Sequence, residues 1–198
     1  MKQIVLATKN QGKIREMRDL LAPMNIEVLS LADFSPTADA EENGATFAEN
    51  AMLKARYYYA HTNTPCLADD SGLEVDALGG RPGVYSARYS GENATDESNN
   101  AKVLAEMADV PEESRTARFR CAMALVGDGI ELTADGTCEG ILLTEKRGDG
   151  GFGYDPIFYV PAFGCTLAEL SSDEKNSISH RGSAVRKMAD LLAERTAR

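Results

Sequence analysis

The segment 116–126 constrains the fold of this chain more than any other part of its sequence. One side of the segment carries apolar residues at every second position, namely Phe119, Cys121, Met123 and Leu125. Arg118 and Arg120 are among the residues on the other side. A period of two residues is typical of a β-strand, and the Gly-Asp-Gly run at 127–129 predicts a hairpin turn into a second strand. The fold therefore has to include a long antiparallel strand pair.

Strands and helices alternate along the rest of the chain. Apolar runs predict strands at residues 3–8, 27–31, 65–68 and 73–78. Helical spacing of apolar residues and helix-capping residues predict helices at residues 12–21, 46–59, 96–107 and 182–194. This alternation predicts the α/β fold class, with a long mixed central sheet flanked by helices. We find no repeat, low-complexity tract or linker, so we expect a single domain over residues 1–198.

The composition limits the class of protein. The chain has 198 residues, of which 43% are hydrophobic, and this suffices for one substantial core that can divide into two lobes. Its formal net charge of −10 argues against nonspecific binding to nucleic acid or to an anionic membrane surface. The first residues enter an apolar strand without a signal-peptide pattern, so we expect a cytoplasmic protein. The cysteines at positions 66, 121, 138 and 165 lack metal-ligand spacing, and we expect reduced, mostly buried thiols.

The first candidate site lies where the first strand turns into the first helix, at Thr8-Lys9-Asn10-Gln11-Gly12-Lys13. Free amide N–H groups and the positive end of the helix dipole gather at such a turn, and two lysines add charge. These features favour a phosphate-binding turn. The run lacks the spacing of a P-loop, so an ordinary capped helix start is the alternative.

The second candidate site is the pair Asp69 and Asp70, directly after the apolar strand at 65–68. Open α/β sheets commonly place ligand-binding groups at the carboxyl ends of their strands. Neighbouring side chains of a strand point to opposite faces, so at most one of the two carboxylates has to face a ligand. With Glu41 or Glu42 alongside, Asp70 would bind a hard cation such as Mg²⁺ through oxygen. The alternative is a set of solvated acids in loops.

Two further segments combine unusual chemistry in a few residues. In the run 151–156, glycines flank Phe152, and such a loop either presents its ring to a planar ligand or caps the core with it. Just before the last helix stand three basic donors, Lys175, His180 and Arg181. Positive charge at a helix N-terminus opposes the helix dipole, so a negative or electron-rich ligand would offset it.

Taken in order, six sequence blocks resemble those of the inosine triphosphate pyrophosphatase family. They are ATKNQGK at residues 7–13, TFAENA at 46–51, ADDSGL at 68–73, PGVYSAR at 82–88, GFGYDP at 151–156 and SHRG at 179–182. Each block is weakly specific alone, but their order over nearly the whole chain is highly specific. Lys9 departs from the family pattern, since many relatives have glycine there; a lysine is compatible with phosphate binding.

The resemblance implies hydrolysis of a non-canonical purine nucleoside triphosphate (ITP, dITP or XTP) between its α and β phosphates, with Mg²⁺. It also implies a homodimer, with the substrate in an active-site cleft between two lobes of one α/β fold. Asp70 would be the catalytic residue and, together with Glu41, a metal ligand, although Glu42 is an open alternative to Glu41. The implied substrate-binding residues are Thr8, Lys9, Asn10, Gln11, Gly12, Lys13, Ser71, Phe152, Gly153, Tyr154, Asp155, Lys175, His180 and Arg181.

Selectivity for the base needs polar groups, because stacking on Phe152 accepts every base. We hypothesise that donors around His180 and Arg181 meet the purine 6-oxygen and so disfavour adenine. Two other functions stay open. One is a pyrophosphatase of other modified nucleotides, such as modified pyrimidine nucleotides. The other is a noncatalytic nucleotide-sensing module, which has no evident need for carboxylates beside the cations.

Overall fold

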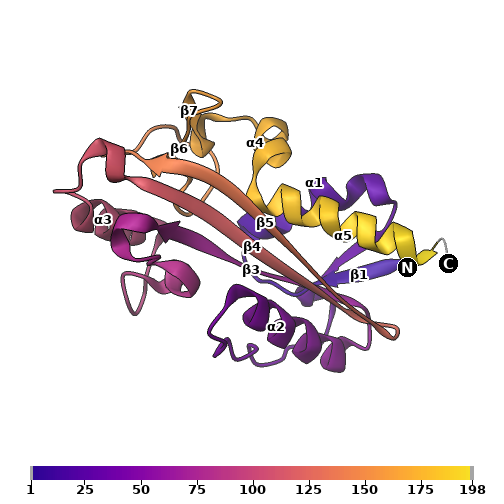
Figure 1. Cartoon of the computed structure of the whole chain (residues 1–198). Coiled ribbons are helices and arrows are strands. Elements are labelled where there is room, and N and C mark those ends of the chain that lie inside the picture. The colour runs from indigo at the N-terminus through magenta and orange to yellow at the C-terminus, as the bar shows by residue number, and fades with distance from the viewer. Residues whose placement is uncertain (1, 197–198) are drawn as a thin grey trace. The chain divides into compact units, whose positions relative to one another are not determined.

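The computed structural model describes residues 2–196, which form a seven-stranded sheet flanked by helices (Figure 1). The strands are β1 Gln3–Leu6, β2 Glu27–Ser30, β3 Cys66–Val75, β4 Thr116–Gly127, β5 Ile130–Leu142, β6 Phe158–Val160 and β7 Cys165–Thr166. The α-helices are α1 Gln11–Leu21, α2 Phe47–Thr62, α3 Asp96–Glu106, α4 Ser172–Ile178 and α5 His180–Thr196. Short 3₁₀ turns lie at Ala22–Met24, Leu31–Asp33, Asp76–Leu78, Gly83–Arg88, Glu112–Ser114, Asp155–Ile157 and Leu167–Glu169.

The sheet is mixed, with strand order β2-β1-β3-β4-β5-β6-β7. β1 pairs parallel with β2, where Ile4 lies opposite Val28, and parallel with β3, where Val5 lies opposite Cys66. β6 pairs antiparallel with both of its neighbours, β5 and β7. These pairings confirm the predicted α/β class with a long mixed sheet.

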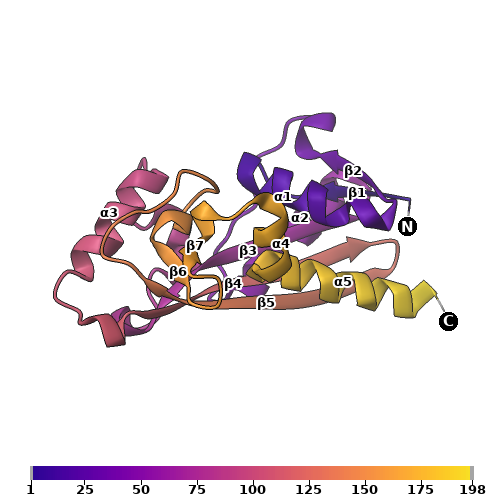
Figure 2. The same ribbon diagram turned by 90° about the horizontal axis from the view of Figure 1, so that it is seen from above.

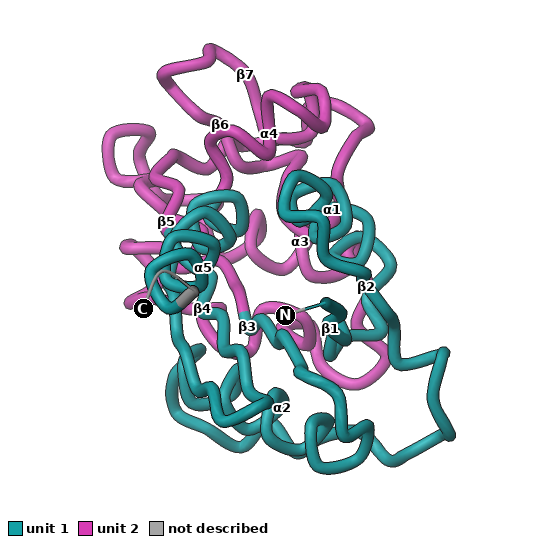
Figure 3. The backbone as a smooth tube through the Cα atoms, turned by 90° about the vertical axis from the view of Figure 1, so that its right-hand side faces the viewer, with its two compact units in different colours: residues 1–70, 121–136, 180–198 teal, residues 71–120, 137–179 magenta. Residues whose placement is uncertain are grey.

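The chain divides into two compact units (Figure 3). Unit 1 comprises residues 1–70, 121–136 and 180–198, and unit 2 comprises residues 71–120 and 137–179. β3, β4 and β5 each contribute residues to both units. Each unit has a buried core of its own.

The core of unit 1 covers both faces of its strands. On one face lie α1 and α5 (Figure 1), which bury Ile14 and Met188 among others. On the other face α2 packs through Ala51 and Ala55 against further alanines of the strands, so the helix approaches the sheet closely. Because both faces are covered, β4 is buried on both sides from Cys121 onward, beyond the single apolar face that its sequence predicted.

The core of unit 2 is built around α3 and the parts of β3, β4 and β5 that belong to this unit. Val103 and Met107 come from the region of α3 and are fully buried. Phe119 of β4 and Phe158 of β6 pack against each other with ring centres 4.7 Å apart. Tyr154, two residues after Phe152 in the run 151–156, belongs to the same cluster.

β3 is longer than the sequence predicted. Separate extended segments were expected at 65–68 and 73–78, whereas β3 runs unbroken through residues 69–72. The acidic side chains of this stretch have ionic partners on neighbouring elements. The two aspartates therefore lie inside a strand and not in the loop after one.

Two helix starts also differ from expectation. The pattern of Thr46 followed three residues later by Glu49 predicts a capping box at the start of α2. Thr46 Oγ does accept a hydrogen bond from Glu49 N–H, but the Glu49 carboxylate accepts from Ala45 N–H, so the capping box is incomplete. The segment before the last helix is itself helical, as α4, and α5 begins at His180 instead of residue 182.

β4 and β5 form the long hairpin that the alternating segment predicted (Figure 2). At its turn Asp128 and Gly129 have φ angles of 53° and 74°, as a two-residue type I′ turn requires. β5 continues through Gly136, where a Cβ atom would lie 2.0 Å from the carbonyl oxygen of His180. The missing side chain of Gly136 thus lets β5 pass directly against the start of α5.

The cysteines are free thiols, as predicted. Cys66, Cys121 and Cys138 are buried, and Cys165 is half-buried. Burial raises the pKa of the Cys66 thiol to about 11, which disfavours the reactive thiolate. Within residues 2–196, no helix has the length and apolar character needed to cross a membrane.

Candidate active site

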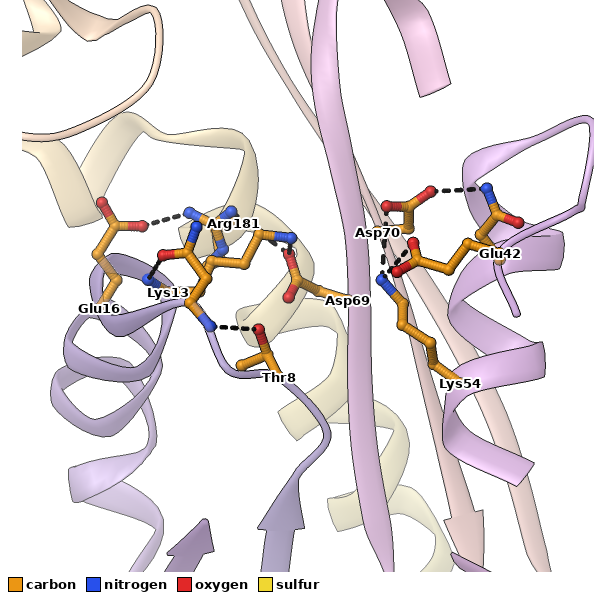
Figure 4. Close-up of polar contacts among 10 residues, drawn as sticks. Thr8, Lys13, Glu16, Glu42, Lys54, Asp69, Asp70 and Arg181 are labelled. Atoms are coloured by element: carbon orange, nitrogen blue, oxygen red, sulfur yellow. Dashed lines mark hydrogen bonds and ion pairs between the residues drawn. The ribbon is translucent and has the colours of Figure 1, made fainter. Parts of the chain in front are cut away.

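Asp69 and Asp70 are neighbours in β3, just past the end of β1. β1 pairs with β3 at Cys66 and Leu67, so the two carboxylates follow directly after the paired segment. Consecutive side chains of a strand point to opposite faces. Figure 4 shows the two carboxylates on opposite sides of the strand, each with its own set of charged partners.

Asp69 lies between two cations. Lys13 Nζ is 2.8 Å and Arg181 Nη2 is 3.3 Å from the same Asp69 oxygen, and Arg181 also pairs with Glu16 (Figure 4). Arg181 is 1% exposed and Asp69 is 2% exposed. Burial by itself would raise the pKa of Asp69, but Lys13 and Arg181 outweigh it and hold that pKa below its ordinary value. Asp69 is therefore a fixed anion that joins α1, β3 and α5.

Asp70 faces a different group on the other side of β3. Asn50 Nδ2 donates a hydrogen bond to Asp70 Oδ2 at 3.1 Å, and Lys54 Nζ lies 3.5 Å from Asp70 Oδ1. Lys54 also donates to Glu42 Oε2 at 3.0 Å. Burial raises the pKa of Asp70 above its ordinary value despite the opposing charge of Lys54, and the negative charge of Glu42 adds to the rise.

The two neighbouring aspartates thus differ in proton affinity. Titratable groups whose surroundings drive their pKa values apart are typical of acid–base sites. Asp69 stays ionised and holds cations, whereas Asp70 is the carboxylate better able to accept a proton from a water molecule. Asp70 stays the predicted catalytic residue, now with a defined set of neighbours.

The run 8–13 forms the turn into α1, and its last residue reaches Asp69. Asn10 caps the helix, since its Oδ1 accepts a hydrogen bond from Lys13 N–H at 3.1 Å. Asn10 N–H in turn donates to Thr8 Oγ at 3.2 Å. At the surface, Lys9 Nζ lies 2.5 Å from Asp39 Oδ1. The capped start uses one N–H group of the first turn, so it is compatible with an anion at the positive end of the helix.

Glu42 and Asp70 share one ammonium group, that of Lys54. The side chain of Glu41 is exposed, so it is Glu42 that lies with the Asp70 group. In the part of the chain that the structure describes, no three His, Cys, Asp or Glu side chains gather as a metal-binding set. Two carboxylates are nevertheless what Mg²⁺ commonly takes from a protein, the other ligands being water and substrate phosphate.

In unit 2, the loop around Phe152 is held by α4. Lys175 Nζ lies 2.5 Å from Asp155 Oδ2, and the same oxygen accepts the Phe152 N–H at 2.9 Å. Lys175 Nζ also lies 4.8 Å from the centre of the Phe152 ring. Asp155 and Lys175 are both buried. A buried ion pair therefore fixes the backbone that carries the ring.

The other predicted residues have simpler surroundings. Tyr154 is buried and its hydroxyl donates to the Ser86 carbonyl at 2.7 Å, so its ring is part of the core of unit 2. Ser71 is half-buried and follows Asp70 in β3. Gln11, Gly12 and His180 lie at the helix starts of unit 1, and Gly153 follows Phe152 in unit 2.

The predicted base-binding residues are divided between the units. His180 and Arg181 belong to unit 1, whereas Phe152 and Lys175 belong to unit 2. Their joint contact with a base stays a prediction.

Comparison with known proteins identifies the family. The model of the Ham1 family matches residues 4–191. The chain belongs to the Ham1 family. It is 52% identical over 197 residues to a dITP/XTP pyrophosphatase of Bacillus cereus, covering 98% of this chain and 96% of that protein. A dITP/XTP pyrophosphatase of Geobacillus kaustophilus is 54% identical over 195 residues, with the same coverage of 98% and 96%. A solved Ham1 protein from Coxiella burnetii matches with a TM-score of 0.87 and 46% identity, covering 98% of this chain and 100% of that one.

Three residues of this Ham1-family site were missed in the sequence, namely Asn50, Lys54 and Glu16. Asn50 and Lys54 lie one turn apart on α2 and are both buried. A buried polar residue rarely lacks a partner. Two polar residues four positions apart on the inward face of a predicted helix therefore indicate a buried polar site, and this signal was available in the sequence. Glu16 had no such signal, because its partner Arg181 is distant in the chain.

Proposed function

We propose that this Ham1-family protein hydrolyses dITP, XTP and related non-canonical purine nucleoside triphosphates to the monophosphate and pyrophosphate. The observation that carries the proposal is the pair of aspartates in β3, one held ionised among cations and the other with a raised pKa. Relatives more than half identical over nearly the whole chain are named dITP/XTP pyrophosphatases, which supports the same substrate class.

The residues of unit 1 would act on the triphosphate. Lys13 and the N-terminal turn of α1 would bind phosphate oxygens, with Lys54 as a further cation. The water oxygen forms a bond to the α-phosphorus while the bond from that phosphorus to the bridging oxygen breaks, and pyrophosphate leaves. Asp70 would accept the proton of the attacking water, since its carboxylate lies beside Asn50 and Lys54 on the face of β3 opposite Asp69. Asp69 keeps Lys13 and Arg181 in place during this step.

We further propose Mg²⁺ as the cofactor, held by Asp70 and Glu42. The donor set fits, since both carboxylates offer oxygen ligands and share the single positive charge of Lys54. Bound there, Mg²⁺ would neutralise charge on the phosphates and on the leaving pyrophosphate. Glu41 was the ligand expected from the sequence, and the position of Glu42 beside Lys54 favours Glu42 instead.

The residues of unit 2 would bind the base. Phe152 offers a ring for stacking, and Lys175, paired with Asp155, is a charged donor next to that ring. We retain His180 and Arg181 as the proposed donors to the purine 6-oxygen. The expected consequence is that changes at these two residues alter the ITP:ATP ratio of kcat/KM, whereas the stacking ring does not discriminate.

The decisive experiment is hydrolysis of ITP, XTP, ATP and GTP, with Mg²⁺ and with a chelator, with pyrophosphate and phosphate detected separately. We expect pyrophosphate from ITP and XTP only when Mg²⁺ is present. Asp70→Asn should lower kcat by about 100-fold or more. Asp109→Asn, which changes an exposed carboxylate, serves as the control and should retain the rate. Equal rates on all four nucleotides would contradict the proposal.

The same assay separates the alternatives. A sensor module would bind ITP tightly without forming a product, and an enzyme for modified pyrimidine nucleotides would prefer those in a wider panel. We also propose that the enzyme acts as a homodimer in the cytoplasm, where free nucleoside triphosphates are found. Light scattering after size exclusion would measure the mass in solution. A mass of 21.3 kDa, that of the monomer, would contradict the proposed dimer.

A further inference from the structure

The helix α3 holds both polar groups of the Gly153 backbone. The N–H of Gly153 donates to Asp96 Oδ2 at 2.7 Å, and its carbonyl accepts from Asn100 Nδ2 at 2.7 Å. Asn100 Nδ2 donates in addition to the Asp96 carbonyl at 2.6 Å. Asp96 and Asn100 are one turn apart on α3, so the helix presents both side chains on one side. All these groups belong to unit 2.

Gly153 has the left-handed backbone conformation that favours glycine. Its φ angle is +63°, and a Cβ atom built there would have no heavy atom within 4 Å. Phe152, directly before it, has its N–H bonded to the Asp155 carboxylate and its carbonyl bonded to Asp155 N–H at 3.3 Å. Asp155 thus holds the backbone of Phe152, and α3 holds the backbone of Gly153. Glycine rotates freely unless hydrogen bonds hold it.

The start of α3 is itself well defined. Thr95 and Ser98 form a reciprocal capping box at this end of the helix. Asn100 is 3% exposed, and its Oδ1 accepts no hydrogen bond from the residues that the structure describes. Only the donor half of the Asn100 amide is therefore in use, and it points at the Gly153 and Asp96 carbonyls. A leucine has nearly the same shape and would remove these donors alone.

We propose that Asp96 and Asn100 are positioning residues that fix the Phe152 ring for stacking on the purine base. The inference rests on the proposed function, in which Phe152 stacks on the base. Neither residue acts on the phosphates, whose proposed ligands belong to unit 1. Loss of either side chain therefore weakens binding of the base and leaves binding of the phosphates unchanged.

The first test is steady-state kinetics on ITP and XTP. Asp96→Ala and Asn100→Leu should each raise KM by about fivefold to tenfold, with kcat changed by less than about threefold. Asp96→Asn keeps an acceptor for the Gly153 N–H and should restore a KM close to the wild-type value. Glu97→Ala is the matched control, because Glu97 is the next residue of α3 and pairs with Lys146 at the surface.

The second test shows whether the two residues act through the ring. In a Phe152→Ala background, adding Asn100→Leu should leave KM unchanged, because the ring that Asn100 positions is gone. If Asn100→Leu raised KM by the same factor with and without Phe152, the residue would not act through the ring and the proposal would be wrong.

The third test is calorimetric binding of ITP and of inorganic tripolyphosphate, which lacks a base. Asp96→Ala and Asn100→Leu should weaken ITP by about fivefold to tenfold and leave tripolyphosphate unchanged. Equal weakening of both ligands would indicate a general structural defect and overturn the proposal, as would no change in either. A wild-type protein that releases no pyrophosphate from ITP would sink the proposed function instead, and the binding comparison would still decide the role of α3.

Discussion

At the scale of single residues, β3 gives two adjacent aspartates opposite electrostatic surroundings. Asp69 is enclosed by Lys13 and Arg181, which lower its pKa, whereas burial raises the pKa of Asp70. The difference arises because a strand turns successive side chains to opposite faces, and the two faces carry different elements of unit 1. One residue type therefore serves as a structural anion at one position and as a proton acceptor at the next.

We expect Asp69→Asn to lower the free energy of unfolding by about 3 kcal/mol at pH 7, because it leaves two buried cations without their shared carboxylate. The folded pKa of Asp69 lies below its unfolded value of about 3.9. Its contribution is thus present above that unfolded value and lost as the pH falls through the folded pKa. Urea unfolding at several pH values should show the wild type and the variant converging below about pH 4.

Asp70→Asn is the matched control for this prediction. The folded pKa of Asp70 is raised, so its ionised form is less favourable in the folded than in the unfolded chain. Removing that charge should leave the unfolding free energy at pH 7 unchanged or slightly higher. Equal destabilisation by the two substitutions would show that the surroundings of the two aspartates do not differ as described.

Glu41 and Glu42 are a second pair of adjacent acidic residues, and we expect only Glu42 to bind Mg²⁺. Glu42→Gln should raise the Mg²⁺ concentration needed for half-maximal activity by roughly tenfold, because one carboxylate ligand is lost. Glu41→Gln should change it by less than about twofold, since this side chain is exposed. Titration of activity with Mg²⁺ measures the requirement of both variants. A larger effect of Glu41→Gln would show that Glu41 is the metal ligand.

At the scale of elements, close contact between β5 and α5 positions the first residue of that helix. A Cβ atom at Gly136 would lie 2.0 Å from His180 O and 2.7 Å from Ala184 N. These are backbone atoms, which cannot move aside as the end of a flexible side chain can. The glycine is therefore required for space, and the start of α5, with His180 and Arg181, depends on it.

We expect Gly136→Ala to lower the unfolding free energy by about 3 kcal/mol and to raise KM, because the start of α5 has to shift. Gly129→Ala at the hairpin turn is the comparison. No heavy atom lies within 4 Å of a Cβ there, so only its φ of +74° opposes the change, at about 1 kcal/mol. Thermal melting of the two variants tests whether Gly136→Ala destabilises the protein more than Gly129→Ala. A larger effect at position 129 would contradict this prediction.

At the scale of the whole molecule, three strands run from one compact unit into the other, namely β3, β4 and β5. Unfolding of either unit would break strands that the other needs. Arg115 lies within unit 2, where its buried guanidinium donates to the carbonyls of Met107, Leu142 and Leu143. We therefore treat the units as parts of one cooperative structure.

The corresponding prediction is a single unfolding transition for both units. The chain has no tryptophan, so Leu53→Trp in unit 1 and Phe163→Trp in unit 2, both at exposed positions, provide separate reporters. Their urea midpoints should coincide, and Arg115→Lys should lower both by the same amount, because it removes donors from buried carbonyls. Two separate midpoints would show that the units unfold independently.

Much of the fold could be predicted from the sequence, because its signals are local. The alternation at 116–126 and the turn after it predicted β4, β5 and their hairpin. The continuation of β3 through residues 69–72 was not predicted, since the partners Lys13, Lys54 and Arg181 are remote in the chain and cannot be seen in a local pattern. The role of Asp69 was missed for the same reason.

The sequence by itself determined the main helices and the long hairpin, the acidic and basic groups available for chemistry and, through the order of its motifs, the family. Only the tertiary structure decided which carboxylate lies beside which cation, and hence that Asp70 and Glu42 share Lys54 while Asp69 holds Lys13 and Arg181. The physical reason is that backbone pattern depends on neighbouring residues, whereas the proton affinity of a buried group depends on the charges that folding brings to it.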